Sequence, residues 1–435
     1  MEKHPQEYIK NYLNNMSEFK YDLGIIGLGY VGLPLAIYSI EGGLKVFGYD
    51  INSEKVSKLN NGQSPIEDIS DETLKKSLKS NLTFSDDSSK LAECEHIVIS
   101  VPTPLTDFKP DLSYVISAAK EIAKNIVKGQ VIILESTTYP GTTTEVLIPE
   151  IEKTTDLVVG EDIFVGYSPE RIDPGNKEWN FKNTPKVISG INEKSLNKIK
   201  SFYEQIIEVV VVTSGTKEAE MVKLLENTYR QVNIALINEL AILCNMLDID
   251  IWEVVDAAKT KPFGFESFRP GPGVGGHCIP IDPKYLSFKT RQIGKPVRFV
   301  ELAQEINNSM PSYVVNRIIE RMNILGKPMK GSKILILGVA YKKDISDTRE
   351  SPAIDVIENF LAKGVEIAFY DPFVDNLKVN NLEIKKEINF KNFHDYDMHL
   401  LHTPHSEFVK LNLSQYNVPI FDATGSDFID DAERI

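Results

Sequence analysis

The chain has 435 residues, of which 42% are hydrophobic and 25% are charged, and its formal net charge is −14. This length predicts a globular protein of two or three domains, and no apolar run reaches the roughly 20 residues of a membrane-spanning helix. The acidic balance argues against a general binding surface for nucleic acids or anionic membranes.

The first segment, residues 1–20, is polar and lacks the apolar centre of an export signal, so we expect an N-terminal extension without chemistry. The three cysteines, Cys94, Cys244 and Cys278, are far apart and have no metal-ligand spacing, which indicates a reducing cytoplasm and no metal site. Cys94 precedes a strand-like run and Cys244 lies in an apolar helical stretch, so we expect both to be packing residues.

An apolar strand at residues 22–27 leads directly into a Gly-x-Gly-x-x-Gly motif formed by Gly27, Gly29 and Gly32, and a helix and a second strand ending at Asp50 follow. In this motif the first glycine permits a tight turn, the second lets a pyrophosphate approach the backbone, and the third lets helix and strand pack closely. Asp50 can accept hydrogen bonds from a ribose diol and would repel a 2′-phosphate. The segment therefore predicts an NAD site rather than an NADP site.

Five further apolar runs predict strands that alternate with helical stretches up to about residue 213: 96–104, 130–138, 164–170, 186–190 and 209–214. This pattern predicts a doubly wound parallel sheet, in which ligands bind outside the carboxyl ends of the strands. The polar residues at those ends are Thr103, Ser136, Thr137, Glu170 and Arg171.

Residues 215–246 predict one long helix that is more apolar than a single core requires, so we expect it to join two domains and to pack against a second subunit in a homodimer. Lys223 and Asn227 lie one turn apart on one face of it, where each would otherwise be a solvated surface residue. After residues 326–332 the strand–helix alternation resumes without a second Gly-x-Gly-x-x-Gly motif. The predicted fold is α/β, with two Rossmann-like doubly wound parallel-sheet domains joined by a long central helix.

The loop at residues 270–283, PGPGVGGHCIPIDP, presents one thiol among glycines and prolines. Such a run cannot lie inside a helix or a central strand, and Cys278 has no packing context like those of the other two cysteines. A buried structural thiol is the alternative. His277 lacks partner ligands at metal spacing, so we interpret it as part of the loop architecture.

Seven motifs in chain order resemble those of the nucleotide-sugar 6-dehydrogenases, the UDP-glucose/GDP-mannose dehydrogenase family: GLGYVGLP, SVPTP, ESTTYPGTT, SPERIDPG, EMVKLLENTYR, PGPGVGGHCIPIDPKYL and YKKDISDTRESP. The resemblance implies that C6 of a nucleotide sugar is oxidised from alcohol to acid while two NAD⁺ are reduced. It also implies an organisation in four parts: an extension (1–20), an NAD-binding Rossmann domain (21–213), a central helical domain with the cysteine loop and the dimer interface (214–325), and a UDP-sugar-binding Rossmann-like domain (326–435).

The resemblance further implies the roles of individual residues. Cys278 would add to the aldehyde intermediate and carry the thioester, and Lys223 and Asn227 would stabilise oxyanions at C6. Asp282 would assist water or proton transfer, Thr137 would position the water, and Glu170 would act in thioester hydrolysis. The residues implied to contact NAD are Gly27, Gly29, Tyr30, Val31, Gly32, Asp50, Thr103, Thr137 and Arg349. Those implied to contact the UDP-sugar are Glu170, Arg171, Lys223, Asn227, Arg269, Gly275 and Lys342.

Within the family, the KPFGF segment at residues 261–265 resembles the branch that oxidises UDP-N-acetylglucosamine to its uronate for surface polysaccharides. Ile281 stands where UDP-glucose enzymes usually carry a basic residue, whereas Arg269 stands where this branch usually carries an aromatic one. UDP-N-acetylmannosamine, UDP-N-acetylgalactosamine and UDP-glucose remain alternative substrates.

Two other classes of protein share parts of this pattern. A two-electron dehydrogenase of the hydroxyacid type needs no cysteine nucleophile, so the thiol in the loop argues against it. A catalytically silent nucleotide-binding protein would normally have lost Cys278, Lys223 or Asp282, and all three are present.

Overall fold

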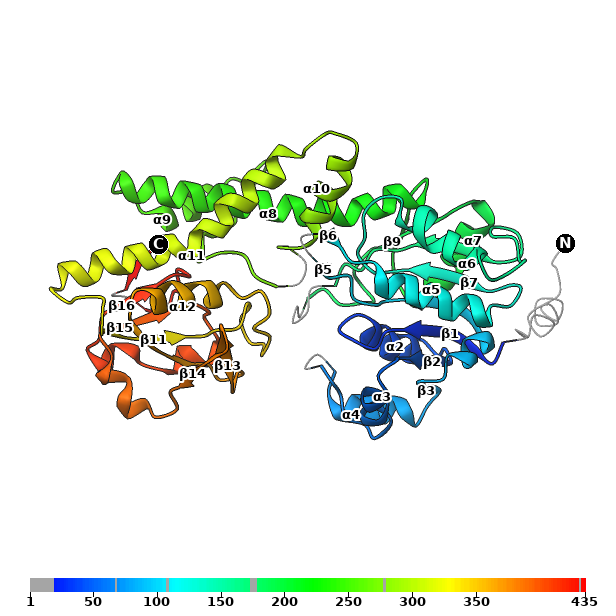
Figure 1. Ribbon diagram of the computed structural model, residues 1–435, viewed down its shortest axis with the longest axis horizontal. Coiled ribbons are helices and arrows are strands. Elements are labelled where there is room, and N and C mark those ends of the chain that lie inside the picture. The colour runs from blue at the N-terminus through cyan, green and yellow to red at the C-terminus, as the bar shows by residue number, and fades with distance from the viewer. Residues whose placement is uncertain (1–18, 67–68, 107–108, 173–177, 277–278, 430–431) are drawn as a thin grey trace. The chain divides into compact units, whose positions relative to one another are not determined.

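The structure is a computed structural model, and it describes residues 19–66, 69–106, 109–172, 178–276, 279–429 and 432–435. The chain divides into two compact units, which meet between Leu224 and Leu225. Each unit is built around its own sheet (Figure 1).

The sheet of the first unit has eight strands in the order β10-β9-β8-β7-β4-β1-β2-β3. Their bounds are β1 Tyr21–Ile26, β2 Val46–Tyr49, β3 Leu82–Ser85, β4 Cys94–Ile99, β7 Val131–Leu134, β8 Phe164–Tyr167, β9 Lys186–Gly190 and β10 Val210–Val212. The strand order reverses beside β1, which pairs in parallel with β2 on one side and with β4 on the other. A doubly wound sheet binds ligands at this type of switch point.

The helices and short elements of the first unit lie between these strands, and they are η1 Ser88–Glu93, α2 Gly32–Glu41, α3 Ser53–Asn60, α4 Asp71–Leu78, α5 Ser113–Asn125, η2 Thr143–Leu147, α6 Ile148–Glu152, α7 Glu193–Tyr203 and the hairpin β5 Leu105–Thr106 with β6 Lys109–Pro110. Helices cover both faces of the sheet, and the central strand β7 is apolar and buried along its whole length. The core includes Ile25, Val98 and Ile133 from three neighbouring strands.

The prediction of a parallel sheet needs one correction in this unit, because β9 runs antiparallel to β8. No helix or strand is assigned to the described residues between Tyr167 and Lys186. A parallel return to the sheet requires a crossover connection, usually a helix, so the chain turns back along its neighbour instead.

The sheet of the second unit has seven strands in the order β13-β14-β12-β11-β15-β16-β17. Their bounds are β11 Lys333–Leu337, β12 Glu366–Tyr370, β13 Leu377–Val379, β14 Leu382–Lys386, β15 Met398–Leu401, β16 Ile420–Asp422 and β17 Glu433–Arg434. The order again reverses beside the first strand, here β11, which pairs in parallel with β12 and β15. The exception to parallel pairing is the β13–β14 hairpin.

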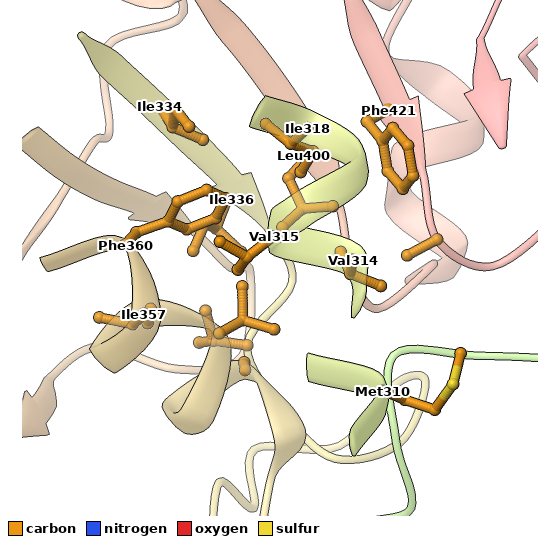
Figure 2. Packing of buried hydrophobic residues seen from close by; sticks show 14 of the residues in the cluster. Met310, Val314, Val315, Ile318, Ile334, Ile336, Ile357, Phe360, Leu400 and Phe421 are labelled. Carbon is orange, nitrogen blue, oxygen red and sulfur yellow. The ribbon is translucent and has the colours of Figure 1, made fainter. Parts of the chain in front are cut away.

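The second unit also contains α9 Ile251–Ala258, α10 Asp282–Gln292, α11 Arg298–Ile324, α12 Pro352–Ala362, η3 Phe390–Asp395, η4 Ser406–Lys410 and η5 Leu413–Tyr416. Figure 2 shows side chains of α11, β11 and α12 packed together on one face of the sheet, among them Val315, Ile336 and Phe360. On the other face, Leu335 and Leu337 belong to a smaller cluster with residues of η3 and η4. Alternate residues of β11 therefore enter opposite cores, as the pleat of a strand requires.

Helix α8, Thr216–Met246, has 31 residues and contains the boundary between the units. The expectation of two Rossmann-like sheets joined by a long helix is thus confirmed, with one antiparallel pairing in each sheet. Cys94 is fully buried and Cys244 packs against the core of the second unit, so both are packing residues. Burial raises the pKa of the Cys94 thiol to about 12. The division into four parts with the stated boundaries stays a prediction.

Candidate active site

The glycine turn between β1 and α2 has the geometry of a dinucleotide site. Gly27 has φ of +94°, which L side chains rarely adopt. A Cβ at Gly32 would lie 2.0 Å from the Gly27 carbonyl oxygen, whereas a Cβ at Gly29 would meet nothing within 4 Å. The turn thus has no room for a side chain at Gly32, where helix and strand meet, and has open space beside Gly29. No side chain caps the start of α2 and its first turn holds no acidic residue, which suits a phosphate group.

Asp50, directly after β2, is 6% exposed and its carboxylate is already oriented. One oxygen, Oδ2, accepts hydrogen bonds from the Leu28 amide at 3.1 Å and from Lys55 Nζ at 2.7 Å. The other oxygen accepts from the Asn52 amide at 3.0 Å. These contacts fix the carboxylate beside the glycine turn, so the turn and Asp50 fit the two parts of a dinucleotide.

Four further residues expected at the cofactor lie around the same edge of the first unit's sheet, whereas Arg349 belongs to the second unit. Val31 is the N-cap residue of α2 and Tyr30 is 38% exposed beside it. Thr103 follows β4 and Thr137 follows β7, and these two strands are paired neighbours. Ser136 Oγ donates to the Val101 carbonyl at 2.7 Å, which ties the two strand ends together.

Glu170 lies beyond the end of β8, and its carboxylate is held on both oxygens. Oε1 accepts from the amides of Arg171 at 2.8 Å and Ile172 at 2.6 Å, and Oε2 lies 3.3 Å from Lys186 Nζ. Burial acts to raise the pKa of Glu170, but the charges of Lys186 and Lys223 and the Ile172 amide outweigh it and lower the pKa. The Arg171 side chain donates to the Pro185 carbonyl at 2.6 Å, so it braces the loop.

Lys223 is 8% exposed on α8, and its charge acts on Glu170 within the first unit. One turn earlier on α8, the fully buried Glu220 accepts hydrogen bonds from the Thr143 amide at 2.8 Å and the Thr143 hydroxyl at 2.7 Å. Glu220 also accepts from the Gly141 amide at 2.5 Å. These bonds attach the start of α8 to the loop that follows Thr137. Glu220 was not predicted as a site residue, although it is the first residue of the EMVKLLENTYR motif.

In the second unit, Asn227 and Asp282 are in direct contact. Asn227 Nδ2 donates to Asp282 Oδ2 at 2.5 Å, and Asp282, the first residue of α10, is 3% exposed. The structure therefore brings together two residues that the sequence analysis assigned to the reaction centre. Cys278 and His277 lie outside the described residues.

The part of the cysteine loop that the structure describes packs against the segment after β11. A Cβ at Gly275 would lie 2.8 Å from both the Glu350 carbonyl oxygen and Tyr341 Cβ, and one at Gly276 would lie 2.7 Å from the Tyr341 ring. The expected contact of Gly275 with the UDP-sugar stays a prediction. The observed contacts give Gly275 and Gly276 a structural reason, namely the close approach of the neighbouring backbone and ring.

Lys342 lies on that same segment and is half-buried. The segment is fastened through Asp344, whose amide donates to His405 Nδ1 at 2.9 Å and whose carboxylate accepts from the Ser406 amide at 2.7 Å. Arg349 makes a two-bond ion pair with Asp347, at 3.0 and 2.8 Å.

Arg269, expected at the sugar, makes contacts that brace its own unit. It donates to the Gly425 carbonyl at 3.2 Å and to Asp256 Oδ1 at 3.3 Å, and its guanidinium stacks on Trp252. These contacts explain a basic residue at this position without a ligand, and the expected role of Arg269 at the substrate stays a prediction.

Comparison with known families identifies the chain. Models of the UDP-glucose/GDP-mannose dehydrogenase family match residues 21–207 as the NAD binding domain, 217–309 as the central domain and 335–429 as the UDP binding domain. The chain belongs to this family of NAD-dependent nucleotide-sugar dehydrogenases, and NAD is its cofactor.

Named relatives carry two different sugar assignments. The chain is 37% identical over 390 residues to a UDP-N-acetyl-D-glucosamine 6-dehydrogenase of Pseudomonas aeruginosa, covering 89% of this chain and 91% of that one. It is 37% identical over 353 residues to a UDP-N-acetyl-D-mannosamine dehydrogenase of Methanococcus maripaludis, covering 80% and 79%. The structure of a UDP-D-ManNAc dehydrogenase from Pyrococcus horikoshii superposes with a TM-score of 0.86 at 33% identity, covering 94% and 96%. Among the helices that the structure describes, none combines the length and apolar character needed to cross a membrane.

Proposed function

We propose that the chain catalyses the four-electron oxidation of C6 of a UDP-N-acetylhexosamine to the uronate, with Cys278 as the nucleophile. The observation that carries the proposal is the single thiol of the PGPGVGGHCIPIDP loop in a chain that matches the family along most of its length. The glycine turn after β1 and Asp50 would hold NAD⁺, which would supply the hydride acceptor for each of the two oxidations, one molecule for each.

The first oxidation converts the C6 alcohol to an aldehyde, with a hydride lost from carbon and a proton lost from oxygen. The Cys278 thiol then adds across the aldehyde carbonyl and forms a thiohemiacetal, from which a second hydride and a proton leave to give a thioester. Water attacks the thioester, the C–O bond forms, the C–S bond breaks, and the acid and the thiol are released. A hydride cannot leave an aldehyde carbon without this prior addition.

The residues described above supply the other roles in this proposal. Lys223 and Asn227 lie one turn apart on α8 and would stabilise the negative charge that develops on the C6 oxygen. Asp282, in contact with Asn227, would handle the proton of that oxygen or of water. Glu170, whose pKa is lowered by Lys186 and Lys223 against the effect of burial, would accept a proton from the water that opens the thioester. Thr137 would position that water, and Lys342 would hold the UDP end.

We propose UDP-N-acetylglucosamine as the sugar, because the KPFGF segment resembles that branch and a relative named for this sugar matches over 89% of the chain. UDP-N-acetylmannosamine is the second candidate, because a relative of equal identity and the superposed structure are named for it. Both sugars carry a 2-acetamido group.

We also propose that the protein is a homodimer that associates through α8. The helix exposes Leu236 by 50%, Leu243 by 47% and Met246 by 77%. Their spacing of seven and three residues places them on one face of the helix, and an apolar stripe of this kind favours a partner helix.

The proposed chemistry is tested by Cys278→Ser with Cys244→Ser as the matched control, since Cys244 is a packing thiol. We expect Cys278→Ser to bind NAD⁺ normally in a fluorescence titration and to form acid more slowly by on the order of 10³-fold or more, as for other removed nucleophiles. Cys244→Ser should turn over normally. Wild-type rates of acid formation in Cys278→Ser would disprove the nucleophile assignment.

A further inference from the structure

A buried ionic cluster lies behind Glu170 in the first unit, and none of its other members was identified from the sequence. Lys186, the first residue of β9, is 4% exposed, and its Nζ lies 2.8 Å from Glu135 Oε1 and 3.3 Å from Glu170 Oε2. The Tyr203 hydroxyl donates to the same oxygen of Glu135. One lysine thus connects two carboxylates, and a tyrosine holds the farther one.

The antiparallel strand β9 brings Lys186 to this place. Tyr167 of β8 pairs with Ser189 of β9, and continuing that register by three residues along each strand puts Glu170 opposite Lys186. Glu135 directly follows β7, the other neighbour of β8, and Tyr203 is the last residue of α7. Four separate elements therefore converge at the carboxyl edge of the sheet, where ligands of a doubly wound fold bind.

The two carboxylates of the cluster differ in access and in charge. The Glu135 side chain is 0% exposed, and its Oε2 has no hydrogen-bond partner in the part of the chain that the structure describes. The Glu170 side chain is 12% exposed. Burial raises the pKa of Glu135 in spite of the attraction of Lys186, whereas the pKa of Glu170 is lowered. Of the two, Glu170 is the one that a ligand can reach.

Lys186 is too buried for a ligand to reach, and its ammonium group is paired with Glu135 on one side and Glu170 on the other. Burial acts to lower the pKa of Lys186, but Glu135 and Glu170 outweigh it and raise the pKa. A buried ammonium group is costly unless it is paired and hydrogen-bonded. An aliphatic side chain at this position would pack in the core without the cost of burying a charge. The positive charge of Lys186 is therefore best explained by an effect on Glu170.

We propose that Lys186 is a positioning residue for Glu170, which orients the Glu170 carboxylate toward the water that opens the thioester and supplies the positive charge beside it. Glu135 and Tyr203 hold Lys186 from the opposite side. In that step an O–H bond of water breaks and its proton passes to Glu170, while the new C–O bond forms and the C–S bond breaks. This inference rests on the role proposed above for Glu170, and it adds a residue that does not itself touch the substrate.

The test uses the full-length enzyme and the variant Glu135→Gln/Lys186→Met. The pair is changed together because removing Lys186 alone would leave two buried carboxylates, whereas neutral replacements of similar volume are tolerated in place of buried ion pairs. Glu170→Gln reports on the proposed function itself. Lys186→Arg tests rescue by a cation, and Lys194→Met, which breaks the exposed pair with Glu161, is the matched surface control.

We expect Glu135→Gln/Lys186→Met to keep the rapid formation of NADH in the first turnover and to lose at least about tenfold in steady-state kcat, because hydrolysis becomes limiting. The acidic limb of its kcat profile should move up by about 1–3 pH units, since the cation that stabilises the ionised Glu170 is gone. Lys186→Arg should recover part of kcat, and Lys194→Met should match the wild type.

Three outcomes separate the hypotheses. Normal turnover in Glu170→Gln would overturn the role of Glu170 and with it this inference. A loss in Glu170→Gln with an unchanged kcat and pH profile in Glu135→Gln/Lys186→Met would overturn the inference alone. Equal losses of the first-turnover phase, of NAD⁺ affinity and of kcat in the double variant would show a purely structural role for Lys186 and would also overturn it.

Discussion

At the scale of single residues, the acid expected at the cofactor, Asp50, is paired with a base. Asp50 was expected to accept hydrogen bonds from a ribose and to repel a 2′-phosphate, and the structure adds Lys55, whose Nζ lies 2.7 Å from its Oδ2. Lys55 is 32% exposed and Asp50 is 8% exposed at their side chains. We therefore expect Asp50 to favour NAD in two ways, by repelling a 2′-phosphate itself and by neutralising the positive charge of Lys55.

We predict that Asp50→Ala weakens NAD⁺ binding by about 1.5–3 kcal/mol, the usual loss for hydrogen bonds to a charged group. NADP⁺ should bind better than to the wild type, because Lys55 is left to attract the 2′-phosphate. Isothermal titration with both cofactors measures this, and Glu54→Ala, an exposed acid on the next helix, is the control. An unchanged NAD⁺ affinity in Asp50→Ala would contradict the ribose assignment.

Residues in a local motif could be predicted, whereas residues that meet only through the fold could not. Gly27, Gly32 and Asp50 belong to one strand–helix–strand unit whose spacing fixes their geometry. Glu135 and Lys186 are 51 positions apart (186 − 135), and they meet because β9 runs antiparallel to β8. In the sequence each is only a charged residue next to an apolar run, since Glu135 follows one run and Lys186 precedes another.

At the scale of elements, Gly275 and Gly276 of the cysteine loop are explained by the segment that faces them. The two loops pack so closely that a Cβ at Gly275 would lie 2.8 Å from Tyr341 Cβ and 2.9 Å from Pro352 Cδ. At Gly271, in the same loop, the nearest atom would be 4.0 Å away. A side chain therefore has room at Gly271 but not at Gly275, and the two positions provide a matched pair for substitution.

We predict that Gly275→Ala lowers the free energy of unfolding by about 1–3 kcal/mol, the usual cost of overpacking, and weakens binding of the UDP-sugar because Tyr341 and its neighbour Lys342 are displaced. Gly271→Ala should change neither quantity by more than about 0.5 kcal/mol. Thermal unfolding and sugar titration would measure both variants. Equal effects at the two positions would refute the packing explanation.

Helix α8 provides a second test at this scale. We predict that Leu236→Glu converts the dimer to a monomer in light scattering, because a charge in an apolar interface is left unpaired. Glu218→Gln, in the first turn of the same helix, should leave the mass unchanged. A wild-type monomer, or a Leu236→Glu dimer, would contradict association through this face.

Elements with a continuous apolar run were predictable, and short strands of mixed polarity were not. Seven of the eight strands of the first sheet and the helix at residues 216–246 follow apolar runs that the sequence displays directly, whereas β3, Leu82–Ser85, was not predicted. The β13–β14 hairpin was not predicted. In the structure Asn380 and Asn381 form its turn, and both have positive φ, as a tight two-residue turn between strands requires. The sequences of β13 and β14, LKV and LEIKK, mix polar and apolar residues over three to five positions, which is too little periodicity to stand out.

At the scale of the whole molecule, the chain repeats one architecture with two different first turns. Both sheets reverse their strand order beside the first strand, but the Gly-x-Gly-x-x-Gly turn occurs after β1 and not after β11. One fold thus provides a dinucleotide site in the first unit, and the second matches the UDP binding domain of the family. Fold class and cofactor follow from these patterns, whereas the identity of the sugar depends on side chains outside them.

The central claim is a four-electron oxidation through a thioester, and the most direct test is the amount of NADH formed per sugar consumed. UDP-N-acetylglucosamine, UDP-N-acetylmannosamine, UDP-N-acetylgalactosamine and UDP-glucose would be offered separately with excess NAD⁺. The account predicts two NADH per sugar, with UDP-N-acetylglucosamine preferred. Two NADH with another of the four would keep the chemistry and change the sugar, whereas one NADH per sugar, or none with any of them, would contradict the account.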